Sequence, residues 1–411
     1  MNSSGDSSRI VIVGAGHAGG RAAAALRDSG HLGPITLLGE EVYPPYERPP
    51  LSKDILDGAM EVSQAYLYSL DWYREHDIEL RMGSRVESID RLNKELNLED
   101  GGKESYDSLL ITTGARPRPL LVPGVIGAKI FYLRDINDSL ALRQQLRSGV
   151  RIAIIGAGLI GLEVAAVARK KGADVIVLEL AKQVLTRVCP DVVSEYIVSL
   201  HESNGVAVRT GLEVGRFEQN GEGIKIHTIS GEVFEVDIVS IGIGSIPNAE
   251  IAALAGIAVN NGIVVDEFGR SSDPDIFAAG DVAQHFNPVL KRSIRLESWQ
   301  NAQSQSNAVA RTMAGDETSY SEVPWFWTDQ YQVNLQIAGS PLKWDCLVMR
   351  GSILDKGFTV FQLDAGIPVA AVTVNNGRDM RPAMKMIEMG RAVDPSLLAD
   401  KSIKLQDLCR N

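Results

Sequence analysis

RIAIIGAGLIGLEVAAVARKKGADVIVLE, residues 151–179, is the segment most informative about the fold, because IVIVGAGHAGGRAAAALRDSGHLGPITLLGE, residues 10–40, repeats its pattern. In each copy a short run of Ile, Val and Ala leads into GxGxxG, and an Ala-rich segment follows. Such apolar runs are typical of strands buried on both faces of a parallel sheet, and the Ala-rich segments of helices. The sequence therefore predicts two strand–turn–helix–strand units.

The glycines of the two turns have a common physical purpose. A tight turn, a close approach of backbone to a pyrophosphate and close packing of helix on strand all exclude larger side chains. The helix that follows offers free N–H groups and a partial positive charge to phosphate. An acid, Glu40 or Glu179, ends each unit about 20 residues after the last glycine, where the motif places an acceptor for ribose hydroxyls. Two dinucleotide sites are predicted, with glycines at positions Gly14, Gly16, Gly19, Gly156, Gly158 and Gly161.

Length and charge restrict the class of protein. A chain of 411 residues with 45% hydrophobic and 23% charged residues has room for two or three globular domains. The 41 basic and 52 acidic residues give a net charge of −11, which argues against a general binder of nucleic acid or anionic membranes.

The cysteines and the apolar segments indicate the compartment. Cys189, Cys346 and Cys409 are far apart and form no CxxC pair, so neither a disulfide framework nor a metal site is predicted. The opening MNSSGDSS lacks the apolar core of a signal peptide. The most apolar window, residues 149–168, contains charges and four glycines, which fits strand, turn and helix better than a membrane span. We therefore expect a cytoplasmic protein.

The loop after the first unit, EEVYPPYERPPLSKDIL, residues 40–56, contains four prolines. They predict irregular backbone until Leu51 and a short helix after it. A rigid loop of this kind can hold side chains over a ligand, and Arg48 and Lys53 are its candidate ligand contacts. A solvated basic loop is the alternative interpretation.

The domain boundaries follow from two matching phrases. YDSLLITTGARPRPL ends the first half near residue 116, and DIVSIGIGSIPN, residues 237–248, ends the second half in the same way. One nucleotide-binding domain is therefore predicted to be inserted in another, and the outer one resumes with a strand that ends at Gly280 and Asp281.

After Pro324 the sequence reads as antiparallel strands with Gly-containing turns, followed by a helix at DMRPAMKMIEMGRAV. The expected fold is α/β, with two Rossmann-like domains and a small α+β C-terminal domain. The predicted ranges are 8–115 with 246–323 for the outer domain, 116–245 for the inserted domain and 324–411 for the C-terminal domain. Trp325, Phe326 and Trp327 could pack in a core or line a flat cofactor.

The ordered motifs resemble those of a known family. GAGHAGG, YERPPLSK, ITTGARPR, GAGLIGLEVA, VLELA with LTRVCP, IFAAGDVA, LESWQNA and PWFWTDQY occur in that order. They resemble the pyridine nucleotide-disulfide oxidoreductase superfamily and, within it, the ferredoxin reductases of bacterial aromatic-ring dioxygenase and cytochrome P450 systems. The resemblance covers nearly the whole chain.

The resemblance implies an FAD site and an NADH site. The residues implied for FAD are Gly14, Gly16, His17, Ala18, Gly19, Glu40, Arg48, Lys53, Thr113, Gly114, Arg116, Gly280, Asp281 and Trp327, with Trp327 next to the isoalloxazine. Those implied for NADH are Gly156, Gly158, Leu159, Ile160, Gly161, Glu179, Arg187 and Gly244. For Arg187, a merely solvated side chain is the alternative interpretation.

A catalytic pair is also implied, in which Glu163 points toward the nicotinamide and pairs with Lys53. Hydride would pass from NADH to FAD, and single electrons from there to a [2Fe-2S] ferredoxin that serves an oxygenase. A carboxylate at Glu179 repels a 2′-phosphate and favours NADH over NADPH, although Lys182 is close enough in sequence to soften that preference.

Several points stay open at the level of sequence. His17 departs from the smaller or apolar residue common in the first turn, and packing is favoured over tuning of the site by its charge. Relatives that reduce disulfides or peroxide carry cysteine after the first unit, and residues 40–60 have none. A rubredoxin reductase and an apoptosis-inducing-factor-like NADH-binding protein remain alternatives. Basic residues that could attract an acidic ferredoxin, or simply be solvated, are Lys291, Arg292, Arg295 and Lys343.

Overall fold

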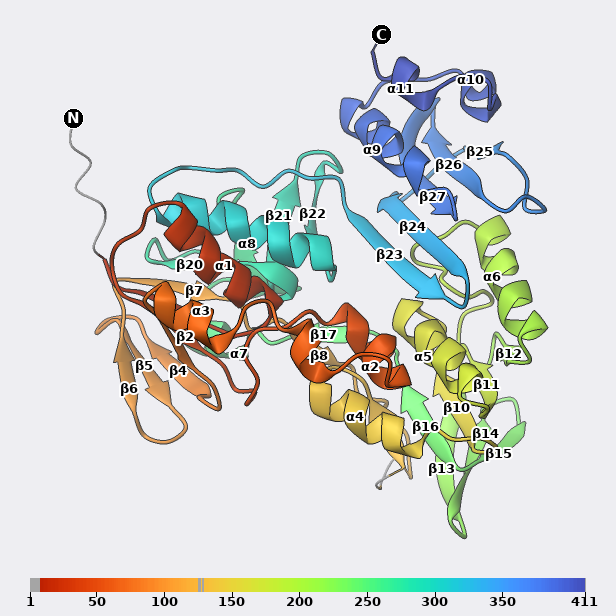
Figure 1. Ribbon diagram of the computed structural model, residues 1–411, viewed down its shortest axis with the longest axis horizontal. Helices are drawn as coiled ribbons and strands as arrows, with labels where there is room; N and C mark the ends of the chain where they lie inside the picture. The colour runs from red at the N-terminus through yellow and green to blue at the C-terminus, as the bar shows by residue number, and fades with distance from the viewer. Residues whose placement is uncertain (1–7, 125–126, 128, 411) are drawn as a thin grey trace. The chain divides into compact units, whose positions relative to one another are not determined.

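The computed structural model describes residues 8–124, 127 and 129–410, and the chain divides into two compact units. The first unit takes residues up to 48, 63–116 and 246–324. The second takes residues 49–62, 117–245 and 325 onward. Each unit contains one of the two glycine-turn repeats (Figure 1).

The first unit is built on a parallel sheet of order β20-β7-β1-β2-β3. Its strands are β1 (Ile10–Val13), β2 (Ile35–Leu38), β3 (Ile78–Arg81), β7 (Ser108–Ile111) and β20 (Ile276–Ala278). All four residues of β1 are buried, because Ile10 and Ile12 face one apolar cluster and Val11 and Val13 another. This two-sided burial is the reason for the continuous apolar run in the sequence.

Helices and antiparallel strands cover opposite faces of that sheet. One cluster joins Ile10 and Ile12 to α1 (His17–Asp28), α3 (Leu70–Glu75) and α8 (Trp299–Met313). Helices α1 and α8 lie side by side (Figure 1). The other cluster contains residues of two small sheets and of α7 (Glu250–Leu254). The small sheets are β4 (Val86–Asp90), β5 (Glu95–Leu98) and β6 (Lys103–Ser105), and β18 (Val259–Asn260), β19 (Gly262–Val265), β21 (Ala283–Asn287) and β22 (Arg292–Arg295).

The second unit repeats this architecture with a parallel sheet of order β12-β11-β10-β16-β9. The strands are β9 (Ile130–Tyr132), β10 (Arg151–Ile155), β11 (Asp174–Leu178), β12 (Ala207–Arg209) and β16 (Ile238–Ile241). Ile152 and Ile154 pack with α5 (Leu159–Lys170) and α6 (Asp191–Ser203), while Ala153 and Ile155 pack with an antiparallel sheet. That sheet comprises β13 (Val214–Asn220), β14 (Gly223–Thr228) and β15 (Val233–Val236).

The C-terminal part of the second unit is a five-stranded antiparallel sheet of order β23-β24-β27-β26-β25. Its strands are β23 (Trp325–Gln330), β24 (Val333–Gly339), β25 (Cys346–Arg350), β26 (Phe358–Asp364) and β27 (Ile367–Val374). The expected helix is α9 (Met380–Met389), and two further short helices, α10 (Pro395–Ala399) and α11 (Leu405–Leu408), follow it. The predicted fold class, two Rossmann-like sheets plus a small C-terminal α+β part, is confirmed.

The proline-rich loop differs from the prediction at one point. A 3₁₀ turn, η1 (Pro49–Ser52), begins two residues before Leu51, because proline has a helical φ and is tolerated in a first turn. The predicted short helix follows as α2 (Asp54–Asp57). Both pack in the second unit with α4 (Ile136–Gln145).

The chain crosses between the units close to the predicted boundaries at 116, 245 and 324, and also at 48 and 62. By this division, residues 325 onward belong to the same unit as the second glycine-turn repeat. The assignment of a separate C-terminal domain therefore stays a prediction. In the described ranges, no helix is long and apolar enough to cross a membrane.

Candidate functional site

The first glycine turn, between β1 and α1, uses its three glycines in different ways. A Cβ on Gly14, whose φ is +112°, would lie 2.3 Å from the carbonyl oxygen of Thr112, and one on Gly19 would lie 2.0 Å from that of Gly14. A Cβ on Gly16 would meet nothing nearer than Arg48 Nη2 at 3.8 Å. Gly14 and Gly19 are therefore required by the fold, whereas Gly16 leaves open space.

The second turn, between β10 and α5, repeats this division. A Cβ on Gly156 would lie 2.4 Å from the oxygen of Gly242, and one on Gly161 would lie 2.2 Å from that of Gly156. Around Gly158 there is nothing within 4 Å. An open middle glycine at a helix N-terminus is the arrangement that lets a pyrophosphate approach the backbone, so both turns fit a dinucleotide.

Polar contacts fix the strand end beside the first turn. The Thr112 hydroxyl lies 2.8 Å from the carbonyl oxygen of Gly14, to which it donates. Thr113 donates to the oxygen of Asn248 at 2.7 Å, and the Gly114 oxygen accepts from the Asn248 N–H at 2.9 Å. Arg116 binds the side chains of Asn248 and Glu250 at 2.8 and 2.6 Å. The structure thus assigns Arg116 two partners within its own unit.

The Gly280–Asp281 turn at the end of β20 is held from both sides. The Gly280 N–H donates to Gln305 Oε1 at 2.9 Å, and Arg295 Nη1 donates to the Asp281 carbonyl oxygen at 3.0 Å. A Cβ on Gly280, with φ +78°, would lie 2.9 Å from the Cβ of Ala18. The turn therefore packs directly against the start of α1.

His17, the first residue of α1, is 7% exposed, and its ring lies 5.4 Å from that of Trp299. Burial, reinforced by the charge of Arg21, lowers the pKa of His17 to about 3. The imidazole is neutral at physiological pH. The geometry therefore agrees with the packing role favoured from sequence.

Glu40 and Arg48 differ in how firmly they are held. The Glu40 side chain is 70% exposed and lies 3.4 Å from Arg85. Arg48 is bound to Glu41 at 2.7 Å and to the Tyr46 hydroxyl at 3.1 Å. Its guanidinium is thus oriented within the first unit, while Glu40 is largely exposed and has Arg85 as a distant partner.

In the second unit, Glu179 is the counterpart of Glu40 and is held by backbone. Its oxygens accept from the N–H groups of Ala157 at 2.6 Å and Ala181 at 2.8 Å. At the start of α5, Leu159 is partly buried and Ile160 is 50% exposed. Arg187 is exposed, and Gly244 has φ +105°. The second glycine turn thus lies beside both the fixed carboxylate of Glu179 and the exposed apolar side chain of Ile160.

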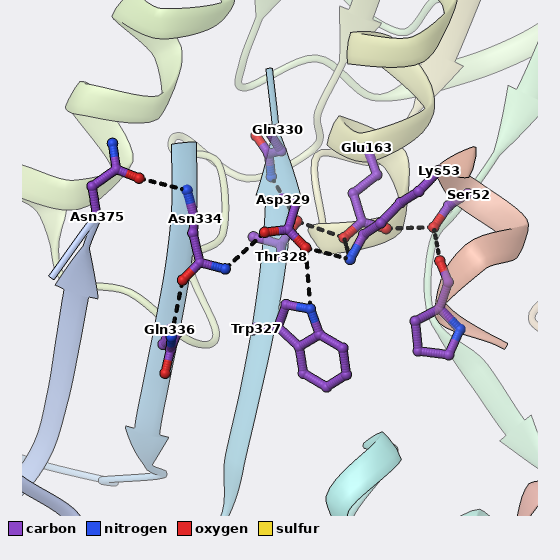
Figure 2. A network of polar contacts seen from close by, with 11 residues as sticks. Ser52, Lys53, Glu163, Trp327, Thr328, Asp329, Gln330, Asn334, Gln336 and Asn375 are labelled. Atoms are coloured by element: carbon purple, nitrogen blue, oxygen red, sulfur yellow. Dashed lines mark hydrogen bonds and ion pairs between the residues drawn. The ribbon is translucent and has the colours of Figure 1, made fainter. Parts of the chain in front are cut away.

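Lys53 and Glu163 come together in the second unit, as predicted, but not as an isolated pair. Lys53 Nζ lies 3.4 Å from Glu163 Oε1 and 3.1 Å from Asp329 Oδ2 (Figure 2). Glu163, on α5, also accepts from the hydroxyls of Ser52 and Thr328, the latter at 2.6 Å. Lys53 therefore bridges two carboxylates, one buried and one half-exposed.

The environment of Glu163 has opposing effects on its acidity. Its side chain is only 6% exposed, and burial raises the pKa of Glu163 above the usual range. Lys53, Ser52 and Thr328 favour the ionised form and offset part of this shift. Burial and these three donors therefore act in opposite directions on the pKa of Glu163.

Trp327 belongs to the same cluster. Its indole N–H donates to Asp329 Oδ2 at 3.1 Å, and Lys53 Nζ lies 5.3 Å from the centre of its ring (Figure 2). The Trp325 ring stacks on it with a centroid distance of 5.2 Å. Asn334 donates to the other Asp329 oxygen at 2.7 Å. Asp329 thereby orients both the ammonium and the indole.

Comparison with known proteins identifies the family. Residues 8–306 match the family model described as pyridine nucleotide-disulphide oxidoreductase, and residues 325–409 match one described as reductase C-terminal. The chain belongs to the pyridine nucleotide-disulphide oxidoreductase family. The resemblance noted in its ordered motifs is thereby confirmed.

Within this family, similar curated proteins are reductases of electron-transfer systems. The ferredoxin–NAD(+) reductase component of the anthranilate 1,2-dioxygenase system of Burkholderia cepacia is 42% identical over 97% of this chain and 98% of its own. Putidaredoxin reductase of Pseudomonas putida is 39% identical over 97% and 96%.

Solved structures of reductases agree with this chain over nearly its full length. Putidaredoxin reductase in its covalent complex with putidaredoxin gives a TM-score of 0.94, with 38% identity and 98% of both chains covered. The ferredoxin reductase for the CYP199A2 system of Rhodopseudomonas palustris gives 0.95, with 36% identity and 98% and 100% covered.

Sequence reasoning missed Ser52, Thr328, Asp329 and Gln305, although it singled out Lys53 and Trp327 beside the first three. A signal was present in β23, because Thr328 and Gln330 are two residues apart and therefore lie on one face of the strand, where both are buried. Buried polar side chains need partners, so these two positions could have been flagged.

Of the candidate docking residues, Arg295 has a side chain that is only 7% exposed and is committed to Asp281 and Glu297. It is not a solvated surface cation. Lys343 is 80% exposed and pairs with Asp364. Among the described residues, no group of three His, Cys, Asp or Glu side chains could hold a metal ion.

Proposed function

We propose that this chain is an FAD-dependent NADH:ferredoxin oxidoreductase that supplies electrons through a [2Fe-2S] ferredoxin to an oxygenase. The observation that carries the proposal is the pair of glycine turns with open middle glycines, one in each compact unit. They fit two dinucleotides, and the similar proteins named above are reductases for ferredoxin or putidaredoxin. FAD, when bound, supplies the conversion between the two-electron chemistry of NADH and the one-electron chemistry of an iron–sulfur cluster.

The first unit is proposed to hold FAD. Gly16 and the N-terminus of α1 would take the pyrophosphate, and Glu40 would turn to the adenosine ribose. The Asp281 turn, fixed by Gln305 and Arg295, would support the middle of the cofactor. Arg48, held by Glu41 and Tyr46, would add a fixed positive charge. The remaining residues assigned to this site by resemblance are proposed on that basis.

The second unit is proposed to hold NADH. Gly158 and the start of α5 would take the pyrophosphate, and the Glu179 carboxylate would accept from the ribose 2′-hydroxyl. Glu163 and Lys53 would meet the nicotinamide end, where the carboxylate orients the ring and the ammonium keeps that carboxylate charged. Trp327, held by Asp329, would offer the flavin a flat apolar surface, the role that the resemblance implies for it.

The choice of nicotinamide cofactor tests the role of Glu179. NADH should give the higher kcat/KM, since a carboxylate repels a 2′-phosphate. Glu179→Ala should narrow the preference by lowering kcat/KM for NADH more than for NADPH. A wild-type protein that prefers NADPH would contradict this assignment.

A visible spectrum and a panel of carriers test the proposed function. Oxidised-flavin bands that bleach on addition of NADH would support both cofactors. Steady-state NADH oxidation should then depend on a [2Fe-2S] ferredoxin. Turnover with rubredoxin alone would favour a rubredoxin reductase, and turnover only with oxygen or quinone would overturn the carrier proposal. A long-lived charge-transfer complex with slow turnover on every carrier would favour an NADH-binding interaction protein.

A cytoplasmic location is part of the same proposal. All three cysteines are free thiols, which suits reducing surroundings. Fractionation of the native host would test the location directly.

A further inference from the structure

A buried chain of hydrogen bonds leads away from Glu163 through the second unit. The Thr328 hydroxyl lies 2.6 Å from Glu163 Oε1, and Gln330 Nε2 lies 3.2 Å from Thr328 Oγ1 (Figure 2). Gln330 Oε1 in turn lies 2.8 Å from Nε2 of His201, on α6. The Tyr331 hydroxyl lies 3.4 Å from the other ring nitrogen of His201. Four side chains from α6 and the β23 hairpin therefore connect to one carboxylate.

The donors in this chain all point toward Glu163. In its ionised form, paired with Lys53, Glu163 can only accept, so the single hydroxyl proton of Thr328 is directed at it. Toward Gln330 the Thr328 oxygen can then only accept, and the amide nitrogen of Gln330 must face it. The amide oxygen consequently faces His201, which must carry its proton on Nε2. One orientation of every group in the chain follows from the charge at its end.

Burial keeps solvent from serving as an alternative partner for these residues. Thr328 and His201 are 0% exposed and Gln330 is 1% exposed. Without Gln330, the Thr328 hydroxyl would have an unfilled acceptor site and greater freedom to rotate. Lys53 and Asp329 are the charged groups on the opposite side of the carboxylate, where they make the ion pairs described above.

The geometry points to Gln330 and His201 as positioning residues that hold the Thr328 hydroxyl on Glu163. This role rests on the proposed function in one respect, namely that Glu163 meets the nicotinamide. Neither residue touches the reacting groups, and each acts through Thr328. Their effect is to keep Glu163 ionised and in a single orientation, because a hydrogen bond to the charged form of a carboxyl group favours that form.

Infrared pH titration of the FAD-loaded protein reads this effect directly. The carbonyl stretch of protonated Glu163, identified by its loss in Glu163→Gln, gives the titration midpoint. Thr328→Val should raise that midpoint by about one pH unit, since a hydrogen bond to a charged group is worth at least the equivalent of one pKa unit. Thr328→Ser keeps the hydroxyl and should retain the wild-type midpoint. Gln330→Met should raise it by less than Thr328→Val.

Non-additivity distinguishes positioning from a general effect on structure. The double variant Gln330→Met with Thr328→Val should titrate like Thr328→Val alone, because Gln330 acts only through that hydroxyl. His201→Phe provides a second variant, which should shift the midpoint in the same direction even if Gln330→Met folds poorly. Unchanged midpoints in folded Gln330 and His201 variants, or additive shifts in the double variant, would overturn the inference.

A matched control is available on the same helix. Ser194 of α6 is 1% exposed, and its hydroxyl donates to the Val184 oxygen at 2.7 Å, away from the chain. Ser194→Ala also removes one buried hydrogen bond, yet it should leave the Glu163 midpoint unchanged. If Ser194→Ala shifted the midpoint as much as Gln330→Met does, the loss of any buried hydrogen bond would have this effect. That result would count against a positioning role for Gln330.

Calorimetric titration of NAD⁺ into the same holoprotein separates this inference from the proposed function. The nicotinamide ring of NAD⁺ is cationic, so its dissociation constant should rise several-fold as pH falls through the Glu163 midpoint, and Glu163→Gln should abolish that dependence. If the infrared midpoints shift as expected while NAD⁺ binding ignores Glu163, the positioning role stands and the placement of Glu163 at the nicotinamide fails.

Discussion

At the scale of single residues, Lys53 is the side chain whose role the structure changes most. The motifs indicate a pair with Glu163, yet Lys53 lies between two acids and is closer to Asp329. A buried carboxylate without a counter-ion is costly, because neutral hydroxyls replace only part of its lost hydration. Lys53 therefore serves stability as well as any chemistry at the nicotinamide.

Removal of the Lys53 charge tests this dual role. Lys53→Met should lower the free energy of unfolding by about 3 kcal/mol, because it leaves Glu163 buried and uncompensated. The double variant Lys53→Met with Glu163→Gln should recover part of that lost stability. Its rate of flavin reduction by NADH should also fall less than that of Lys53→Met alone. Chemical unfolding and anaerobic stopped-flow spectroscopy measure the two effects.

Lys343→Met is the control for that experiment. Its ammonium is 80% exposed and pairs with Asp364, and an exposed pair contributes less than about 1 kcal/mol. Purely additive losses for Lys53→Met and Glu163→Gln would remove the claim that the two residues act as a pair.

His17 predicts the pH dependence of stability on the acid side. Its folded pKa of about 3 lies below the value of 6.5 for an unfolded chain, so below pH 6.5 the unfolded state binds a proton that the folded state does not. Its contribution to stability is complete above pH 6.5 and is lost as pH falls toward 3. The expected slope is about 1.4 kcal/mol per pH unit.

Urea unfolding at several pH values between about 7 and 5 measures this slope, because the proton-linked loss of stability begins in that range. His17→Leu should flatten it. Ser306→Ala, which removes a buried hydroxyl bonded to the Ala302 oxygen but titrates nothing, should lower stability and keep the slope. An unchanged slope in His17→Leu would assign the acid sensitivity to other groups, such as His285.

At the scale of elements, the two strand–turn–helix repeats share one division of labour among their glycines. The first and third glycines allow the chain to pack on itself, and the middle one leaves space at the helix N-terminus. Within six residues, the outer two glycines are therefore needed for folding and the middle glycine for ligand binding. The two effects can therefore be tested by substitutions a few residues apart.

Alanine at Gly158 should leave the fold intact and weaken nucleotide binding. Its φ of −79° suits alanine, and no atom lies within 4 Å of the added methyl group. We expect an unchanged melting temperature and a KM for NADH raised by roughly tenfold, equivalent to about 1.4 kcal/mol. Circular dichroism and steady-state kinetics would measure both.

Gly161→Ala is the matched comparison, since its methyl group would lie 2.2 Å from the Gly156 oxygen. It should destabilise the second unit by about 3 kcal/mol. If Gly158→Ala proved as destabilising as Gly161→Ala, the middle glycine would have a structural role instead.

At the scale of the whole molecule, the C-terminal sheet and the second nucleotide repeat share one core. A single apolar cluster contains Ile154 of β10, Val193 of α6, Leu335 of β24 and Phe358 of β26. The Tyr196 and Phe358 rings meet edge to face at 5.4 Å. The C-terminal residues are therefore part of what stabilises the second unit.

Loss of this shared core should destabilise the second unit as a whole. Phe358→Ala removes a side chain that is 1% exposed and should cost about 3–5 kcal/mol. Phe286→Ala, at a side chain that is 52% exposed, should cost less than about 0.5 kcal/mol. Unfolding followed by near-ultraviolet circular dichroism, with bound NAD⁺ as a reporter of the second unit, would check this. Equal effects of the two substitutions would contradict a shared core.

The fold class, the two glycine turns and the elements around them could be predicted from the sequence. These features are local, because a buried apolar run, a GxGxxG turn and an Ala-rich helix are specified by neighbouring residues. The strands and turns of the C-terminal sheet were likewise predictable from alternation and glycine position. Lys53 and Glu163 were assigned to one another only through the resemblance to a family, since 110 positions separate them in the chain.

The ion pairs and hydrogen bonds between side chains could be established from the folded chain alone. It placed Asp329 beside Lys53, Thr328 and Ser52 on Glu163, and Gln305 and Arg295 on the Asp281 turn. It also gave His201 a partner on β23. Such contacts join residues far apart in sequence, and their energies depend on burial and direction, which no local pattern encodes. Tertiary packing therefore decides how the site is charged, while local sequence decides where its backbone turns lie.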